Sequence, residues 1–90
     1  MGTSSYRISF APKAARQLAK LPRTVQQRIR PRIDALATNP RPRGVVKLAG
    51  ADGVYRLRVG DHRVIYQVED DALLVLVLKI GHAATFTKEG

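Results

Sequence analysis

The sequence of 90 residues predicts a single α+β domain with two N-terminal helices packed on one face of a mainly antiparallel sheet. Two observations support this fold. The first half begins with one segment in which apolar and polar residues alternate, and then has apolar residues at helical spacing. In the second half, apolar and polar residues alternate with a period of two in segments separated by short turns. A chain of this length has room for one hydrophobic core. The expected element order is β-α-α-β-β-β(-β).

The domain is expected to open with a strand and a short helix. In "YRISF", residues 6–10, Tyr6, Ile8 and Phe10 fall on one face, as in a half-buried strand. Pro12 suits a first helical turn because its missing N–H has no partner there. An amphipathic helix then continues to the "LP" at 21–22, where the proline ends it.

A second helix is expected to run from about residue 24 to Thr38. "TVQQ" at 24–27 resembles a capping box, with the hydroxyl of Thr24 and the amide of Gln27 as reciprocal caps. Pro31 removes one backbone hydrogen bond, so a kink or a break is expected there. The apolar stripe that defines this helix consists of Val25, Ile29, Ile33 and Leu36.

The second half of the chain is expected to form a meander of antiparallel strands. Short turns at 50–53, 60–62 and 70–71 favour hairpins between neighbouring strands. The last strand, "ALLVLVLKI", is apolar on both faces and should lie inside the sheet. The expected strands are 45–49, 54–59, 63–69 and 72–80.

The charge of the chain predicts a polyanionic partner. The net charge is +9, and residues 1–43 carry ten basic groups against one acid, Asp34. Nucleic acid is the leading candidate, followed by an acidic protein and an anionic membrane surface. The chain has no cysteine and two histidines, which argues against disulfides and a structural zinc site, and no cofactor is expected. No apolar run or leader pattern suggests a membrane span or export, so a cytoplasmic protein is expected.

Several cations are predicted to converge on the sheet face that the helices leave open. Arg56 and Arg58 are two residues apart on one strand, and Arg63 begins the next. Lys47 lies on the preceding strand, and His82 ends the last one. A guanidinium donates two parallel hydrogen bonds to a phosphate, so this patch is suited to phosphate binding.

Each of these groups also has an ordinary structural interpretation. Arginines on a strand commonly face solvent without a function, and His62 is expected in a turn. His82 can act as a general acid or base or can simply pack at the strand end. The carboxylates are expected to form turns, which gives little support to carboxylate or two-metal hydrolysis. These acids are Asp52, Asp61, Asp70 and Asp71.

The stretch "YRLRVGDHRVIYQVEDDALLVLVLKIGH", residues 55–82, closely resembles the RelE toxins of bacterial type II toxin–antitoxin systems, within the RelE/ParE superfamily. "YRISFAPKAARQLAKLP" and "IDALATNPRPRGVVKLAG" are similar to the opening strand and helix of that family and to its approach to the sheet. The resemblance implies a RelE/ParE-like microbial RNase-type fold over residues 6–90. Residues 1–5 are expected to be a flexible start or a cloning remnant.

The resemblance implies a ribosome-dependent mRNA endoribonuclease (an mRNA interferase) that inhibits translation. RelE-like toxins enter the ribosomal A site, where the 2′-hydroxyl of the mRNA attacks the neighbouring phosphate without a metal. By position, the implied catalytic residues are Arg56, Arg58, Arg63 and His82. The implied partners are a cognate RelB-like antitoxin, the ribosome with its rRNA, and mRNA; operator DNA is reached only through the antitoxin, and no membrane is involved. The implied RNA-binding residues are Lys47, Lys13, Arg16, Lys20, Arg28, Arg30 and Arg32.

The chain departs from the family after "IGH". Family members commonly continue with two arginines, an acid, an apolar residue and tyrosine, whereas residues 83–87 here read "AATFT". Ala83 stands where the family has the arginine that stabilises the transition state, and Thr87 where it has the tyrosine. The resemblance therefore implies a chain inactivated at Ala83 and Ala84, either by natural divergence or by deliberate replacement of an arginine pair.

Two other functions are compatible with these residues. The same superfamily contains ParE-like toxins, which inhibit DNA gyrase by binding. A non-catalytic module that binds RNA or an antitoxin is the remaining alternative. The basic residues Arg56, Arg58, Arg63 and His82 favour the nuclease, and the missing arginine and tyrosine weaken that preference.

Overall fold

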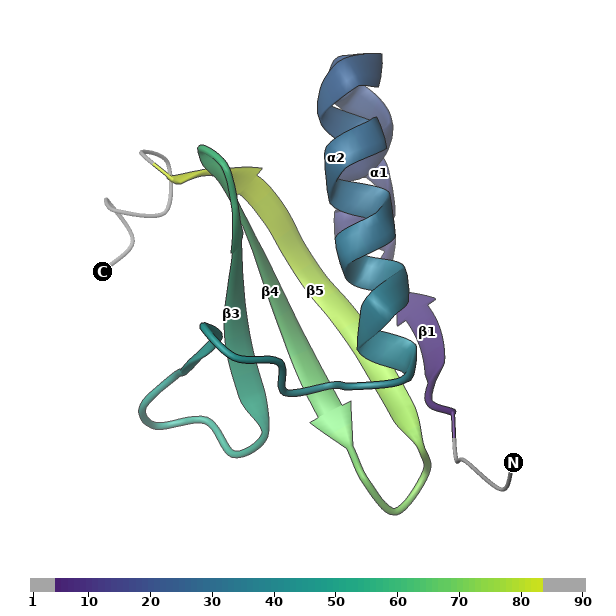
Figure 1. The fold of residues 1–90 in the computed structure, drawn as a ribbon, viewed down its shortest axis with the longest axis vertical. Helices are drawn as coiled ribbons and strands as arrows, with labels where there is room; N and C mark the ends of the chain where they lie inside the picture. Colours follow the sequence, from purple (N-terminus) through teal and green to yellow (C-terminus); the bar gives the residue numbers. More distant parts are fainter. Residues whose placement is uncertain (1–4, 84–90) are drawn as a thin grey trace.

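Two helices pack over one face of a five-stranded sheet, which confirms the predicted α+β fold (Figure 1). The computed structural model describes residues 5–83. None of the helices in this part of the chain is long and apolar enough to cross a membrane. The elements are β1 (Arg7–Phe10), α1 (Pro12–Lys20), α2 (Arg23–Asp34), a 3₁₀ turn (Ala35–Ala37), β2 (Val46–Lys47), β3 (Val54–Val59), β4 (His62–Glu69) and β5 (Leu74–His82).

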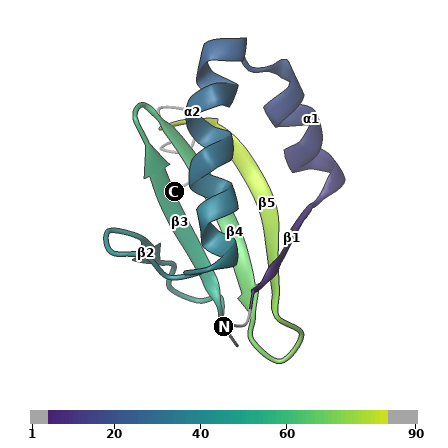
Figure 2. The ribbon, with the colours of Figure 1, turned by 45° about the vertical axis from the view of Figure 1, so that its right-hand side comes forward.

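The strands follow the order β1-β5-β4-β3-β2, so β5 lies inside the sheet as its apolar sequence predicts. The pairs β2–β3, β3–β4 and β4–β5 are antiparallel, and β1 pairs parallel with β5. Figure 2 shows β1 along one edge and β2 along the other. The strand expected at 45–49 shortens to Val46–Lys47, and β4 begins one residue earlier than expected, at His62.

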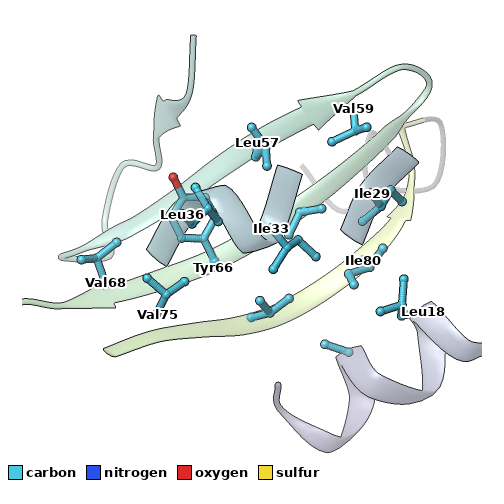
Figure 3. Close-up of a cluster of buried hydrophobic side chains, with 13 residues drawn as sticks. Leu18, Ile29, Ile33, Leu36, Leu57, Val59, Tyr66, Val68, Val75 and Ile80 are labelled. Atoms are coloured by element: carbon cyan, nitrogen blue, oxygen red, sulfur yellow. The ribbon is translucent and has the colours of Figure 1, made fainter. Parts of the chain in front are cut away.

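The hydrophobic core fills the space between the helices and the sheet (Figure 3). Ile29, Ile33 and Leu36 contribute from the second helical segment, each at most 1% exposed. Tyr66 is fully buried, and its hydroxyl donates a 2.7 Å hydrogen bond to the carbonyl of Pro40. Burial raises the pKa of Tyr66 to about 12, so the hydroxyl remains a donor at neutral pH.

The corner between the helices differs from the predicted capping box. α2 begins at Arg23 with Pro22 as its N-cap, so Thr24 lies inside the first turn and makes no capping hydrogen bond. Gln26 instead donates from Nε2 to the carbonyl of Leu21 at 2.9 Å and of Ala19 at 3.4 Å, where it closes the end of α1.

The predicted break at Pro31 does not occur, because α2 continues to Asp34. Pro31 offers no N–H to the carbonyl of Gln27. Both residues are exposed, so water can bind that carbonyl.

Gln17 covers the edge of β5 beyond the end of β1. β1 pairs with β5 only as far as Phe10 and Val77, and the next backbone bond joins the N–H of Ala11 to the carbonyl of Val77. Further along, the N–H of Ile80 donates a 2.8 Å hydrogen bond to Oε1 of Gln17 on α1. The side chain of Gln17 thus replaces the strand partner that β1 does not provide. The helical periodicity of the sequence did not indicate this contact.

Replacing Gln17 by leucine is expected to lower the free energy of unfolding by about 1–3 kcal/mol, because the N–H of Ile80 loses its acceptor in a partly buried place. Urea denaturation of both proteins measures the difference. Arg16→Leu, at an exposed position of the same helix, is the matched control and should change stability by less than about 0.5 kcal/mol. Equal stability of the Gln17→Leu and Arg16→Leu proteins would contradict this role.

Candidate functional site

The sheet face away from the helices carries two cross-strand rows of basic side chains. Arg58 on β3 lies opposite Arg63 on β4, which lies opposite Gly81 on β5. In the next row Arg56 pairs with Ile65, and Ile65 pairs with Lys79. Leu57 and Val64, between these positions, are buried toward the helices, so alternation directs both rows to the open face. Arg56, Arg58, Arg63 and Lys79 are called the arginine face below.

The three arginines of the arginine face form no ion pair with a carboxylate of residues 5–83. Arg58 and Arg63 are directly opposite each other, an arrangement that disfavours the sheet by like-charge repulsion. The ion pair within this part of the chain joins Arg41 to Asp70 and involves none of the three arginines. A bound polyanion would relieve this repulsion.

The two paired arginines differ in their hydrogen bonds. Nε of Arg58 donates to the carbonyl of Gly60 at 3.2 Å. Nε of Arg63 is buried and has no hydrogen-bond acceptor among the described residues. A buried donor of this kind is costly to leave unpaired, so a rotation of the Arg63 side chain that brings it to a ligand oxygen would be favourable. Gly81 beside it has no side chain that would obstruct such a ligand.

Lys79 belongs to this face because of a bulge that the sequence pattern did not reveal. The register of β4 and β5 shifts between Ile65 and Tyr66, whose partners are Lys79 and Val77. Leu78 is therefore an extra residue, and the bulge sets the direction of every side chain that follows. The sequence held one signal for this placement. Lys79 and Gly81 are two residues apart, as residues on the same face of a strand are, and their strand was expected next to that of Arg63.

Two residues expected in the patch point to the other face. Lys47 pairs with Tyr55, which packs against the core, so Lys47 shares the face of the helices. His82 pairs with His62, in line with the buried Ile80 and Val64. The expectation that Lys47 and His82 converge with the arginines is therefore wrong. His62 is also not a turn residue, because it begins β4.

The basic residues of the helices form a separate surface. All of them are exposed and belong to elements on the far side of the core from the arginine face (Figure 2). The chain thus presents two basic surfaces with the core between them, which the sequence alone could not separate. Contact of the helical surface with RNA stays a prediction, as do the catalytic roles. The helical residues concerned are Lys13, Arg16, Lys20, Arg28, Arg30 and Arg32.

Asp70 and Arg41 form an ion pair at the opposite end of the sheet, beside the turn between β4 and β5. The Arg41 guanidinium donates to both oxygens of Asp70, at 3.3 and 2.7 Å, and its Nε donates to the hydroxyl of Tyr55 at 2.9 Å. The hydroxyl of Tyr6 donates to the same carboxylate at 2.6 Å. The hydrogen bonds from Arg41 and then from Tyr6 lower the pKa of Asp70. The expected turn residue therefore also links β1, the loop after α2 and the β4–β5 turn.

Replacing Asp70 by asparagine is expected to lower stability at pH 7 but not in acid. A carboxylate with a lowered folded pKa stabilises the protein above its unfolded pKa, and this contribution is lost as the pH falls through the folded value. The difference in urea midpoint between the two proteins should therefore begin to narrow below about pH 4, near the unfolded pKa, and close as the pH falls through the lower folded pKa. Asp71→Asn is the matched control. A gap that persists unchanged at pH 3 would show that the carboxylate charge is not responsible.

The departure from the family pattern begins one residue after β5. The N–H of Ala83 donates to the carbonyl of Asp61 at 2.8 Å, which extends the ladder past the strand. Ala83 directly follows His82, the last residue of β5, and is two positions beyond Gly81, the partner of Arg63. The position where the family has an arginine therefore adjoins the arginine face. Ala84 to Thr87 lie outside the described residues.

Comparison with known proteins identifies the family. Residues 8–85 match the model of the ParE toxin of the type II toxin–antitoxin system, parDE. The chain belongs to the RelE/ParE toxin family. It is 31% identical over 78 residues to a Methanocaldococcus jannaschii protein designated toxin RelE1, with 83% of this chain and 87% of that protein covered.

Two further relatives of this RelE-like toxin bear on function. The mRNA interferase toxin RelE of Escherichia coli is 29% identical over 79 residues, covering 86% of this chain and 82% of that protein. The archaeal RelE–RelB complex from Pyrococcus horikoshii contains a chain that superposes with a TM-score of 0.78 at 32% identity, covering 88% of this chain and 96% of that one. The predicted family and fold are thus confirmed.

Proposed function

We propose that this RelE-like toxin is an mRNA endoribonuclease that acts in the A site of the ribosome, in the cytoplasm. The observation that carries the proposal is the arginine face, where Arg58 and Arg63 oppose each other and Nε of Arg63 lacks an acceptor among residues 5–83. The E. coli relative carries the name mRNA interferase, which supports RNA as the substrate.

The proposed reaction is transesterification within the mRNA. The 2′-oxygen bonds to phosphorus, the bond from phosphorus to the 5′-oxygen breaks, and the products are a 2′,3′-cyclic phosphate and a 5′-hydroxyl. Negative charge grows on the phosphoryl oxygens in the transition state, and preplaced guanidinium groups stabilise it. Arg56, Arg58 and Arg63 perform this role, and Lys79 adds positive charge in the same face. His82 projects from the other face, so no proton transfer is assigned to it.

The proposed partners follow from the two basic surfaces. The exposed cations of α1 and α2 contact ribosomal RNA, whose phosphates provide a sequence-independent electrostatic attraction. A RelB-like antitoxin covers and neutralises the toxin, as the RelE–RelB complex of P. horikoshii suggests by analogy. Operator DNA is contacted only through that antitoxin.

Mapping of mRNA 5′ ends in a translating extract tests the nuclease. We expect slow, codon-positioned cuts with 5′-hydroxyl ends that require ribosomes and vanish in the triple variant Arg56→Ala, Arg58→Ala, Arg63→Ala. The triple variant must retain the thermal unfolding midpoint of a folded protein. Cuts that persist in the folded triple variant, or that occur without ribosomes, would overturn the assignment.

Inhibition of DNA gyrase is the second candidate, because the matching family model is that of a ParE toxin. A ParE-like toxin acts by binding and needs no phosphate-cleaving site. DNA damage in cells with intact mRNA would support this alternative, and undamaged DNA with codon-positioned cuts would exclude it.

A further inference from the structure

Two histidines close the ladder between β4 and β5. His62 is the first residue of β4, His82 is the last of β5, and the two are direct partners. The hydrogen bond from the N–H of Ala83 to the carbonyl of Asp61 joins the residues that flank them. His62 and His82 therefore form a non-hydrogen-bonded pair, the type in which opposing side chains of antiparallel strands come closest.

The separation of the two imidazoles matches that of two ligands on one metal ion. Their ring centroids are 5.3 Å apart and their planes cross at 74°. An ion about 2.0–2.1 Å from one nitrogen of each ring lies roughly 3.2 Å from each centroid, and a tetrahedral angle then separates the centroids by roughly 5.2 Å. The χ2 torsion of histidine is broad, so each ring can rotate to turn one nitrogen toward an ion between them.

We propose that His62 and His82 form a two-imidazole site for a divalent late transition ion such as Zn²⁺, with water as the remaining ligands. Imidazole suits Zn²⁺, Cu²⁺ and Ni²⁺. His82 is exposed and His62 is partly exposed, so the ion and its water reach the site. Each imidazole has two nitrogens, so one binds the ion while the other keeps a hydrogen bond.

The surroundings define a reversible site rather than a structural one. Residues 5–83 contain no group of three or more histidines, cysteines or acids that would surround an ion. Structural zinc sites have four protein ligands, so a site with two binds more weakly. Arg58 and Arg63, on the other face of the same strand ends, further reduce affinity for a dication. The proposal does not depend on nuclease activity.

Zinc titration of the full chain without a polyhistidine tag tests the site. The chain has two histidines, so a nitrogen-15 spectrum of the imidazoles contains two ring systems. We expect both to shift together with added ZnCl₂ at pH 7.5 and to saturate at one ion per chain. His62→Gln and His82→Gln should each weaken binding at least about 10-fold, since each removes one of the two protein ligands. Asp71→Asn, at the other end of the sheet, should bind as the parent does.

The site is overturned if only one ring shifts, or if either glutamine variant, folded by its amide spectrum, binds zinc as the parent does. Equal shifts with Mg²⁺, which prefers oxygen ligands, would also overturn it. No RNA or ribosome enters this experiment. Its failure therefore leaves the nuclease proposal intact, and failure of the nuclease leaves the metal site intact.

Discussion

Replacing Ala83 and Ala84 together by arginine is expected to raise the rate of ribosome-dependent mRNA cleavage about 100- to 1,000-fold, the effect of one oriented donor to a developing charge. Ala83 directly follows β5, two positions beyond Gly81, the partner of Arg63, so an arginine there would lie close to the arginine face. The rate is measured from mapped 5′ ends in a translating extract. Induction of the double variant without antitoxin should also arrest growth.

Two variants separate this effect from simple changes in size or charge. Ala83→Gln with Ala84→Gln adds length without a guanidinium and should leave cleavage at the level of the parent chain. Arg63→Ala in the arginine-restored chain should reverse most of the gain, because in the proposed mechanism both guanidinium groups bind one phosphate. Unchanged growth and cleavage in the restored chain would count against both the nuclease assignment and the role of these alanines.

Truncation of Ile33 to alanine is expected to lower the free energy of unfolding by about 2–5 kcal/mol. Ile33 is 1% exposed and lies between α2 and the sheet (Figure 3), so its removal leaves a cavity in the core. Domains of this size are stable by roughly 5–15 kcal/mol, so the loss is a large share of the total. Urea denaturation at pH 7 measures it.

Val46→Ala is the matched control for the core. Val46 is 44% exposed on β2, so removal of two methyl groups there creates no cavity, and we expect a change within about 0.5 kcal/mol. If Ile33→Ala were no more destabilising than Val46→Ala, the helices could not be packed on the sheet as described.

Local periodicity predicted the elements well because each depends on neighbouring residues. The stripe at Ile29, Ile33 and Leu36 is buried, and the alternation around Leu57 correctly assigned Arg56 and Arg58 to a common face. Patterns failed where a competing local interaction was available. Thr24 resembled an N-cap, but the N-cap is Pro22, two residues earlier, and Gln26 caps the preceding helix instead.

Contacts between distant segments were not predictable in this way. No local pattern marks Gln17, yet its Oε1 accepts a hydrogen bond from the N–H of Ile80, 63 positions away. Asp70 had the appearance of a turn residue, yet it binds Arg41 and Tyr6. A polar side chain carries no periodic signal for its partner, because that partner is chosen by the path of the whole chain.

The sequence by itself determined the fold class, the basic character of the chain and the common face of Arg56 and Arg58, because helix and strand periods are properties of the local backbone. Only the tertiary structure decided that Lys79 lies on that face and that His82 lies on the opposite face, where it pairs with His62. The physical reason is strand register. A shift of one residue turns every following side chain to the other face, and the bulge at Leu78 is set by the packing of β5 between β4, β1 and the helices.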